Sequence, residues 1–349
     1  MTLLQYEWRK LARAPMLWIG LALCLGFNCL WMTSAGPQRE IFDQSMQSDL
    51  TPENVFEGYD TGELTEFYRY WLGDSPAGKW MARKYEKLQP RAEHLAESGA
   101  ALDFYAGPIT ESLHELLFGS LFRLILGEAA VLGMLAMLYL LGYEDIQRTT
   151  AAVCASRAGR RLYRAKVLAG LAAAGGGYVL LAAGTLGVYF SLWDYSDIWS
   201  SSISSGFNRL TDMLYSRPVL TWADFTVGRY LAAELALGLV LIAVFALLAA
   251  VCGTLVRHTY LAALTLIVLC LGGLVAPSIC GEAGFWTLYA LFMFGPVLVL
   301  LNPGGWFTEL GLNGFVPWQE TVTAALWLGL LGVGLWLALG RSARKDVLT

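Results

Sequence analysis

Charged residues are scarce in this sequence. Asp, Glu, Lys and Arg make up 15% of its 349 residues, while 56% are hydrophobic; soluble domains carry about 25% charged residues. Such a chain cannot cover a globular surface with charge, which excludes a soluble globular protein. The net charge of −4 also argues against a nucleic-acid-binding protein, because that class concentrates basic residues on one face.

Motifs for metal binding, disulfides and nucleotide binding are also missing. The six cysteines include no C-x-x-C pair, so neither a zinc site nor a disulfide framework is indicated. The three histidines, His94, His114 and His258, are far apart in the sequence, which disfavours a metal cluster or a Ser/His/Asp triad. No G-x-x-x-x-G-K-[ST] segment occurs, so we expect no nucleotide bound in the P-loop manner and no cofactor on this chain.

Long hydrophobic runs, in contrast, are abundant. A bilayer core about 30 Å thick is crossed by about 20 apolar residues in a helix. Six segments meet this requirement: 15–35, 117–142, 167–193, 230–256, 260–280 and 322–340. The sequence therefore predicts an all-α polytopic membrane protein with six transmembrane helices.

The distribution of Lys and Arg predicts the orientation of these helices, since cytoplasmic flanks are enriched in both. The basic stretches are 1–14, 143–166, 341–349 and Arg257. Placing all of them in the cytoplasm requires an even number of crossings, with both termini inside. The inner stretches then carry a net charge of +9 and the outer ones −12.

A seventh apolar run lies in the segment 285–321 and is interrupted by Gly295-Pro296. A seventh crossing would move the basic C-terminal stretch outside, so we expect a re-entrant or outer-leaflet hairpin that does not cross. Irregular backbone of this kind is tolerated where it is buried against protein.

Two outer segments follow from this topology, 36–116 and 194–229. The first is long enough for a small helical cap. Thr51-Pro52 and Ser75-Pro76 each read as a helix N-cap followed by proline at the first helical position. We therefore expect helices that begin at Pro52 and Pro76.

The cytoplasmic face carries two further signals. In residues 3–13 an apolar stripe and a basic stripe share one predicted helix, which is typical of a helix lying in the membrane interface; the stripes consist of Leu4, Trp8, Leu11 and Ala12, and of Arg9, Lys10 and Arg13. The loop 143–166 opens with Glu144-Asp145 and has 24 residues. Anchoring by positive charge alone explains neither its acidic pair nor its length.

These features together resemble the membrane subunit of an ABC-2 type transporter, a type V ABC exporter permease. The resemblance covers the topology of nearly the whole chain. At residue level it rests on Glu144, Thr149, Ser156, Arg157 and Lys166, which stand where the family shows a glutamate, a Gly-Thr pair, a Ser-Arg pair and a lysine. Arg148 replaces the family's glycine, and the proline often found before Ser-Arg is absent.

The resemblance implies a transporter subunit that is not itself an enzyme. The loop would contain a coupling helix that docks on a separate ATPase, present in two copies, which would bind ATP and Mg²⁺. The coupling residues would be Glu144, Asp145, Arg148, Thr149, Ser156 and Arg157. A homodimer or heterodimer in a bacterial cell membrane is implied, and an antimicrobial peptide, drug, lipid or glycan all remain open as cargo.

Polar residues within the spans are candidates for a substrate path, because such residues are costly in hydrocarbon and often functional. Glu128 and Glu234 are predicted at similar depth below the outer boundary, with Arg123 and Arg229 as counter-charges, and Asn28 lies in the first span. Snorkelling to the surface and interhelical hydrogen bonding are the alternatives. Two other functions stay open: a sensor or immunity protein with an acidic outer cap, and an intramembrane enzyme.

Overall fold

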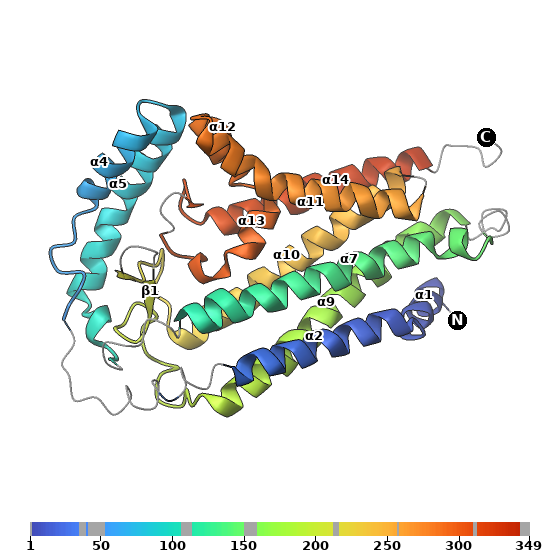
Figure 1. The fold of residues 1–349 in the computed structure, drawn as a ribbon, viewed down its shortest axis with the longest axis horizontal. Helices are drawn as coiled ribbons and strands as arrows, with labels where there is room; N and C mark the ends of the chain where they lie inside the picture. Colours follow the sequence, from blue (N-terminus) through green and yellow to red (C-terminus); the bar gives the residue numbers. More distant parts are fainter. Residues whose placement is uncertain are drawn as a thin grey trace.

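The computed structural model describes residues 2–34, 40, 53–105, 114–149, 159–211, 216–256, 258–309 and 313–342. These residues form an elongated helical bundle with a small helical cap across one end (Figure 1). Helices dominate the described part of the chain, so the predicted helical class is confirmed. A short antiparallel hairpin of β1 (Arg209–Thr211) and β2 (Ser216–Pro218) is a local exception, and the sequence analysis did not predict it.

Six helices are long and apolar enough to cross a membrane, as predicted. Their bounds are α2 Pro15–Thr33, α7 Phe122–Ile146, α9 Gly159–Leu192, α10 Val227–Leu255, α11 Thr259–Glu282 and α14 Gln319–Ser342. A π-helical turn, η2 (Glu115–Leu121), leads directly into α7, so the second candidate span covers 115–146. Helix α9 begins inside the predicted inner loop, because the basic run before residue 167 is already helical.

The bundle has a buried centre and apolar outer faces. Helices α7 and α10 are more than half buried along their most apolar windows, whereas α2, α11 and α14 are largely exposed. The exposed side chains are mostly large and apolar, for example Leu23 on α2, Ile267 on α11 and Trp336 on α14. This reversal of a soluble protein's surface is expected when the surrounding solvent is hydrocarbon.

Small residues allow the central helices to approach closely. A Cβ atom built on Gly133 of α7 would lie 2.8 Å from the Cβ of Ala174 on α9, and one on Gly238 of α10 would lie 2.4 Å from the Tyr178 hydroxyl. Packing through small residues is the usual basis of helix association in membranes. These glycines therefore set the spacing of α7, α9 and α10.

The apolar run after α11 forms two short helices, α12 (Trp286–Phe292) and α13 (Pro296–Leu301), at the cap end of the bundle (Figure 1). The predicted break at Gly295-Pro296 is confirmed. Two carbonyl oxygens freed by the break accept hydrogen bonds from α14: Gln319 Nε2 donates to Met293 at 3.1 Å, and Trp327 Nε1 donates to Phe294 at 2.8 Å. Side chains of α14 therefore satisfy both carbonyl oxygens at the break.

The cap consists of α4 (Thr61–Leu72) and α5 (Pro76–Glu97), which stand across the end of the bundle in Figure 1. The predicted start of α5 is confirmed, because Ser75 Oγ accepts a hydrogen bond from the Gly78 amide. The prediction of a helix from Pro52 is wrong over residues 53–60. The preceding helix begins only at Thr61, because Asp60 provides its N-cap by accepting from the Gly62 amide at 2.7 Å.

The opposite end of the bundle carries α1 (Leu3–Ala12), together with the C-terminal end of α14 (Figure 1). A capping box at Thr2 and Gln5 starts α1, and a turn at Arg13-Ala14 separates it from α2. Leu4 and Trp8 are exposed on α1, whereas Glu7, Lys10 and Leu11 are buried. The prediction that Lys10 belongs to an outward-facing basic stripe is therefore wrong, because Lys10 points into the protein.

Candidate functional site

Four charged side chains meet inside the end of the bundle that carries α1. Lys10 Nζ lies 2.6 Å from Glu7 Oε1 and 2.7 Å from Glu144 Oε1. Lys166 Nζ contacts the other carboxylate oxygen of Glu144 and the carbonyl oxygen of Leu140. We call Glu7, Lys10, Glu144 and Lys166 the inner ion cluster; it joins α1, α7 and α9.

The charges of the inner ion cluster balance, since two carboxylates face two ammonium groups. Burial acts to lower the pKa of Lys10, but the hydrogen bonds and charges of Glu144 and Glu7 outweigh it and raise that pKa above its usual value. The ammonium group of Lys10 also lies 4.7 Å from the ring centroid of Tyr6 and 4.6 Å from that of Tyr143, and such cation–π contacts stabilise a cation further. The cluster is therefore a neutral joint between three helices, in which Glu7 Oε2 is the one buried carboxylate oxygen without a hydrogen-bond partner among the described residues.

Helix α7 ends next to this cluster in an exposed turn. The Thr149 amide donates to the Glu144 carbonyl at 2.9 Å, and the Arg148 amide donates to the Asp145 carbonyl at 3.1 Å. This hydrogen-bond pair is the Schellman motif, whose C′ residue adopts the left-handed conformation and is usually glycine. Here the C′ residue is Arg148, with a φ of 55°, a conformation that costs an L-residue about 1–2 kcal/mol.

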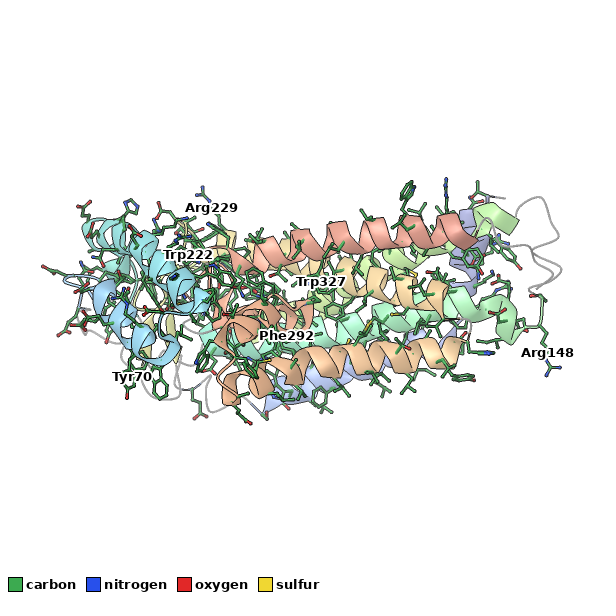
Figure 2. All side chains as sticks on the ribbon, turned by 90° about the horizontal axis from the view of Figure 1, so that it is seen from above. Tyr70, Arg148, Trp222, Arg229, Phe292 and Trp327 are labelled. Atoms are coloured by element: carbon green, nitrogen blue, oxygen red, sulfur yellow. The ribbon has the colours of Figure 1, made fainter. Side chains whose placement is uncertain are left out.

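The structure separates the predicted coupling residues into two groups. Glu144 is buried in the inner ion cluster, so its carboxylate holds helices together and does not face outward. Asp145, Arg148 and Thr149 are exposed, and Figure 2 shows Arg148 at the extreme end of the molecule, opposite the cap. Ser156 and Arg157 lie outside the described residues.

A cavity of about 310 Å³ lies beside this turn, between the ends of α7, α9, α10 and α11. Asp145 and Tyr163 contribute polar atoms to its wall, and Leu138, Leu141 and Val256 are among its apolar lining residues. A Cβ atom on Gly142 would lie 2.2 Å from Thr259 Oγ1, so α7 and α11 touch at one side of the cavity. The cavity makes this end of the bundle less tightly packed than its centre.

The predicted substrate-path residues form two separate polar groups nearer the cap. In the first, Asn28 Nδ2 donates to Glu128 Oε2 at 2.9 Å and lies 3.1 Å from Thr185 Oγ1. Asn28 is fully buried, so it connects α2, α7 and α9 inside the bundle. Arg123 is exposed and its Nε donates to the carbonyl of Leu301 at 2.6 Å, which ties α7 to the end of α13.

The second group surrounds Glu234 on α10. Glu234 is fully buried, and neither of its carboxylate oxygens has a hydrogen-bond partner among the described residues. It interacts electrostatically with Glu320 of α14 and Tyr178 of α9. The snorkelling alternative fails for Glu234, because the side chain does not reach the surface.

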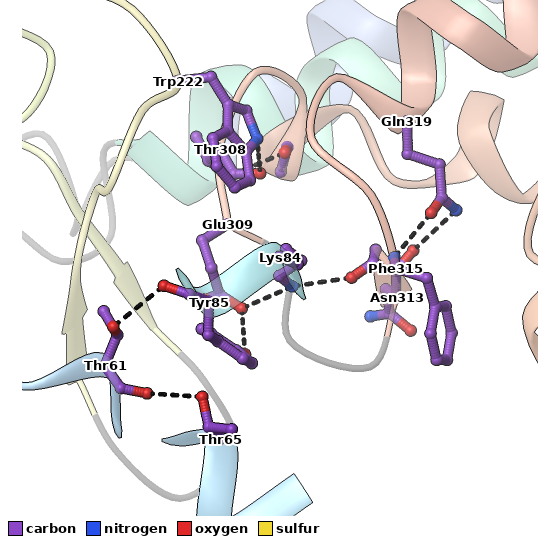
Figure 3. Close-up of polar contacts among 12 residues, drawn as sticks. Thr61, Thr65, Lys84, Tyr85, Trp222, Thr308, Glu309, Asn313, Phe315 and Gln319 are labelled. Atoms are coloured by element: carbon purple, nitrogen blue, oxygen red, sulfur yellow. Dashed lines mark hydrogen bonds and ion pairs between the residues drawn. The ribbon is translucent and has the colours of Figure 1, made fainter. Parts of the chain in front are cut away.

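A third polar cluster, which the sequence analysis missed, fastens the cap to the bundle (Figure 3). Lys84 Nζ lies 3.0 Å from Glu309 Oε1 and donates to the Gly314 carbonyl at 2.7 Å, while the Tyr85 hydroxyl donates to Glu309 Oε1 at 2.6 Å. Burial and the adjacent Glu309 charge raise the pKa of Tyr85. Only the period of the apolar residues on α5 hinted that Lys84 shares a face with Met81 and Leu88.

The rim of the cap has a weaker, exposed contact. Arg91 Nη2 lies 2.6 Å from Asp224 Oδ1, and Arg91 Nε donates to the Thr221 carbonyl at 2.8 Å. The hydrogen bond from Arg91 lowers the pKa of Asp224. Trp222 Nε1 donates to the Thr308 carbonyl at 3.0 Å, so residues 221–224 contact both the cap and the segment after α13.

Comparison with known proteins gave no match: no family model, no curated protein and no solved structure is significantly similar to this chain. Across the described ranges, no group of three His, Cys, Asp or Glu side chains is arranged to hold a metal ion. The fold and its apolar surface define a helical multi-pass membrane protein with six candidate spans.

Proposed function

We propose that this protein is the membrane-spanning subunit of an ATP-driven ABC-2 type exporter that works with a separate ATPase. The observation that carries the proposal is the inner ion cluster beneath the exposed Asp145–Thr149 turn. An ATPase that binds this turn would act on α1, α7 and α9 together, because Glu144 links all three helices.

The helix packing supports transmission of such a movement toward the opposite end. Helix α7 packs extensively against α9 and α10, and α10 packs against α14. The polar group of Asn28, Glu128 and Thr185 lies nearer the cap and joins α7 and α9 to α2. In this proposal a displacement at the inner turn changes the spacing of α2, α7 and α9 around these residues, which then line part of the substrate path together with Arg123 and Glu234.

The proposed topology places both termini and the inner ion cluster in the cytoplasm of a bacterial cell and the cap outside. The charge asymmetry of the sequence supports this orientation. Helices α12 and α13 then form an outer-leaflet hairpin that does not cross. In this class six spans supply half of a translocation path, so two permease chains and two ATPase copies are expected, and the exposed apolar faces of α2, α11 and α14 are available for lipid and for a second chain.

Arg148 offers a direct test. Its left-handed backbone would be more stable as glycine, yet the residue is arginine and its side chain is exposed, which favours a role for the guanidinium in binding a partner. We expect R148E to weaken co-purification with the ATPase and to reduce ATP-dependent transport, because charge reversal at a contact opposes complementary charge on the partner.

The matched control is R229E, the same charge reversal at the opposite end of the bundle, where Figure 2 shows Arg229 near the cap. R229E should leave co-purification unchanged. An R148E protein that folds and retains wild-type ATPase binding would contradict the coupling assignment, whereas equal losses in both variants would indicate a general defect.

A further inference from the structure

Glu234 and Glu320 occupy neighbouring helices of the bundle at the end nearer the cap. Glu234 is the eighth residue of α10 and Glu320 the second residue of α14, and these two helices pack extensively together. Both side chains are buried, with exposed fractions of 0% and 3%. Two carboxylic acids therefore share one enclosed region between two spans.

The surroundings of Glu234 offer no compensating positive charge. Among the described residues, Glu320 is the only charged group that acts on it, and that group has the same sign. The titratable neighbours are otherwise two hydroxyls, Tyr230 on its own helix and Tyr178 on α9. Tyr230 donates its proton to the Trp306 carbonyl at 2.7 Å, and Tyr178 donates to the Leu235 carbonyl at 3.1 Å.

An ionised carboxylate in this position would be buried with no cation from the described residues beside it, and the nearby Tyr230 hydroxyl already donates to the Trp306 carbonyl. Burying a charge without a partner costs several kcal/mol or more, and such groups usually neutralise by taking up a proton. Like-charged carboxylates in one site also oppose simultaneous ionisation. Protonation would remove this buried charge without the binding of anything larger than a proton.

A small cavity of about 20 Å³ lies beside Glu320, near the end of the bundle that carries the cap. Its wall includes Asn302, Asn313 and Gln319, and Asn313 is exposed. This volume holds about one water molecule, so one water molecule fits against the lining that Glu320 shares with Asn302 and Asn313. No set of three metal-ligating side chains is present in the described part of the chain, which also favours a proton over a metal ion.

We propose that Glu234 and Glu320 form a proton-binding site, in which Glu234 holds a proton that it exchanges with the outer aqueous phase through Glu320 and the adjoining cavity. On uptake, a hydronium ion from the outer aqueous phase gives its proton to Glu320 and becomes water, and Glu320 transfers that proton to Glu234; release follows the reverse order. This site goes beyond the proposed export function and does not depend on an ATPase partner. It would make the packing of α10 against α14 sensitive to external pH.

Infrared spectroscopy of the purified full-length protein in lipid nanodiscs tests the proposal. We expect a protonated-carboxyl C=O band at neutral pH that E234Q lowers by the amplitude of one carboxyl group. E234M should lower it equally, so the result does not depend on one variant folding. The matched control is E282Q, because Glu282 is an exposed carboxyl at the end of α11 and its substitution leaves the buried pair intact; the band should be unchanged.

The pairing with Glu320 has its own readout. E320Q should shift the pH at which the Glu234 band disappears by about one unit or more, since strongly interacting groups titrate as a pair. The same substitution at Glu128, which bonds to Asn28, should not. A protonated-carboxyl band of equal amplitude in wild type, E234Q and E234M would overturn the proposal. If the pH at which the Glu234 band disappears is the same in wild type and E320Q, the shared site is overturned.

Discussion

Removal of the Glu144 carboxylate should destabilise the whole inner end of the bundle. In E144Q, Lys10 keeps Glu7 at 2.6 Å, but Lys166 keeps only the Leu140 carbonyl. The site then holds one uncompensated buried ammonium group. Breaking a buried ion pair by removing one partner costs about 3–5 kcal/mol, so we expect a loss of at least about 3 kcal/mol in the free energy of unfolding.

A double-mutant cycle separates the ion pair from other effects of the substitution. K166M removes the stranded ammonium group, so E144Q/K166M should recover most of the stability lost in E144Q, with a coupling energy of about 2 kcal/mol or more. The assay is equilibrium unfolding in mixed micelles of mild and denaturing detergent, followed by tryptophan fluorescence.

The matched control is D145N, which alters the next carboxylate along the chain. Asp145 is exposed, and exposed charge interactions contribute about 0–1 kcal/mol, so D145N should lose about 1 kcal/mol at most. The reasoning is refuted if E144Q unfolds like D145N, or if K166M gives no recovery in the E144Q background.

Three further predictions follow from other contacts. K84M should remove the ammonium group that pairs with Glu309, so hydrogen exchange of the α5 amides should accelerate by the equivalent of about 3–5 kcal/mol. K87M, at an exposed position of the same helix, should leave this exchange unchanged. Equal exchange rates in both variants would contradict the docking of the cap through Lys84. G133V should destabilise the bundle by about 1–3 kcal/mol through overpacking against Ala174, whereas G127V, with open space around its Cβ, should be tolerated in thermal unfolding. The raised pKa of Lys10 stabilises the fold fully at pH values below the unfolded pKa of about 10.4, and this stabilisation is lost as pH rises through the folded pKa. The melting temperature of the wild type should therefore fall more steeply at alkaline pH than that of K10M. Parallel melting curves against pH for the two proteins would contradict a stabilising role of the Lys10 charge.

The spans and their breaks were predictable because the bilayer imposes a strong physical constraint. About 20 apolar residues are needed per crossing, and the chain meets that length in six places. Local rules also worked where one residue decides the geometry: Ser75-Pro76 starts α5, and Gly295-Pro296 breaks the helix before α13. Thr51-Pro52 carries the same N-cap and proline signal as Ser75-Pro76, yet α4 begins at Thr61 with Asp60 as its N-cap. A capping motif shows where a helix can begin, but tertiary packing decides which of the possible starts is used.

The partners of polar side chains were less predictable, because they come from segments far apart in the sequence. Lys10 reads as one more basic residue of an interfacial stripe, and only the approach of α7 shows that it pairs with Glu144, 134 residues later. Lys84 likewise pairs with Glu309 across 225 residues. The left-handed conformation of Arg148 could not be predicted from its residue type, because arginine does not mark a position that favours glycine. The one available signal was the resemblance to a family motif that has Gly-Thr at this position.

Purification of the intact protein from its native membrane tests the central claim most directly. The account predicts that wild-type protein co-purifies in a fixed ratio with a nucleotide-binding subunit that carries a Walker A motif, and that R148E loses this subunit while R229E retains it. Purification of wild type without any nucleotide-binding subunit, or retention of that subunit by R148E, would contradict the account.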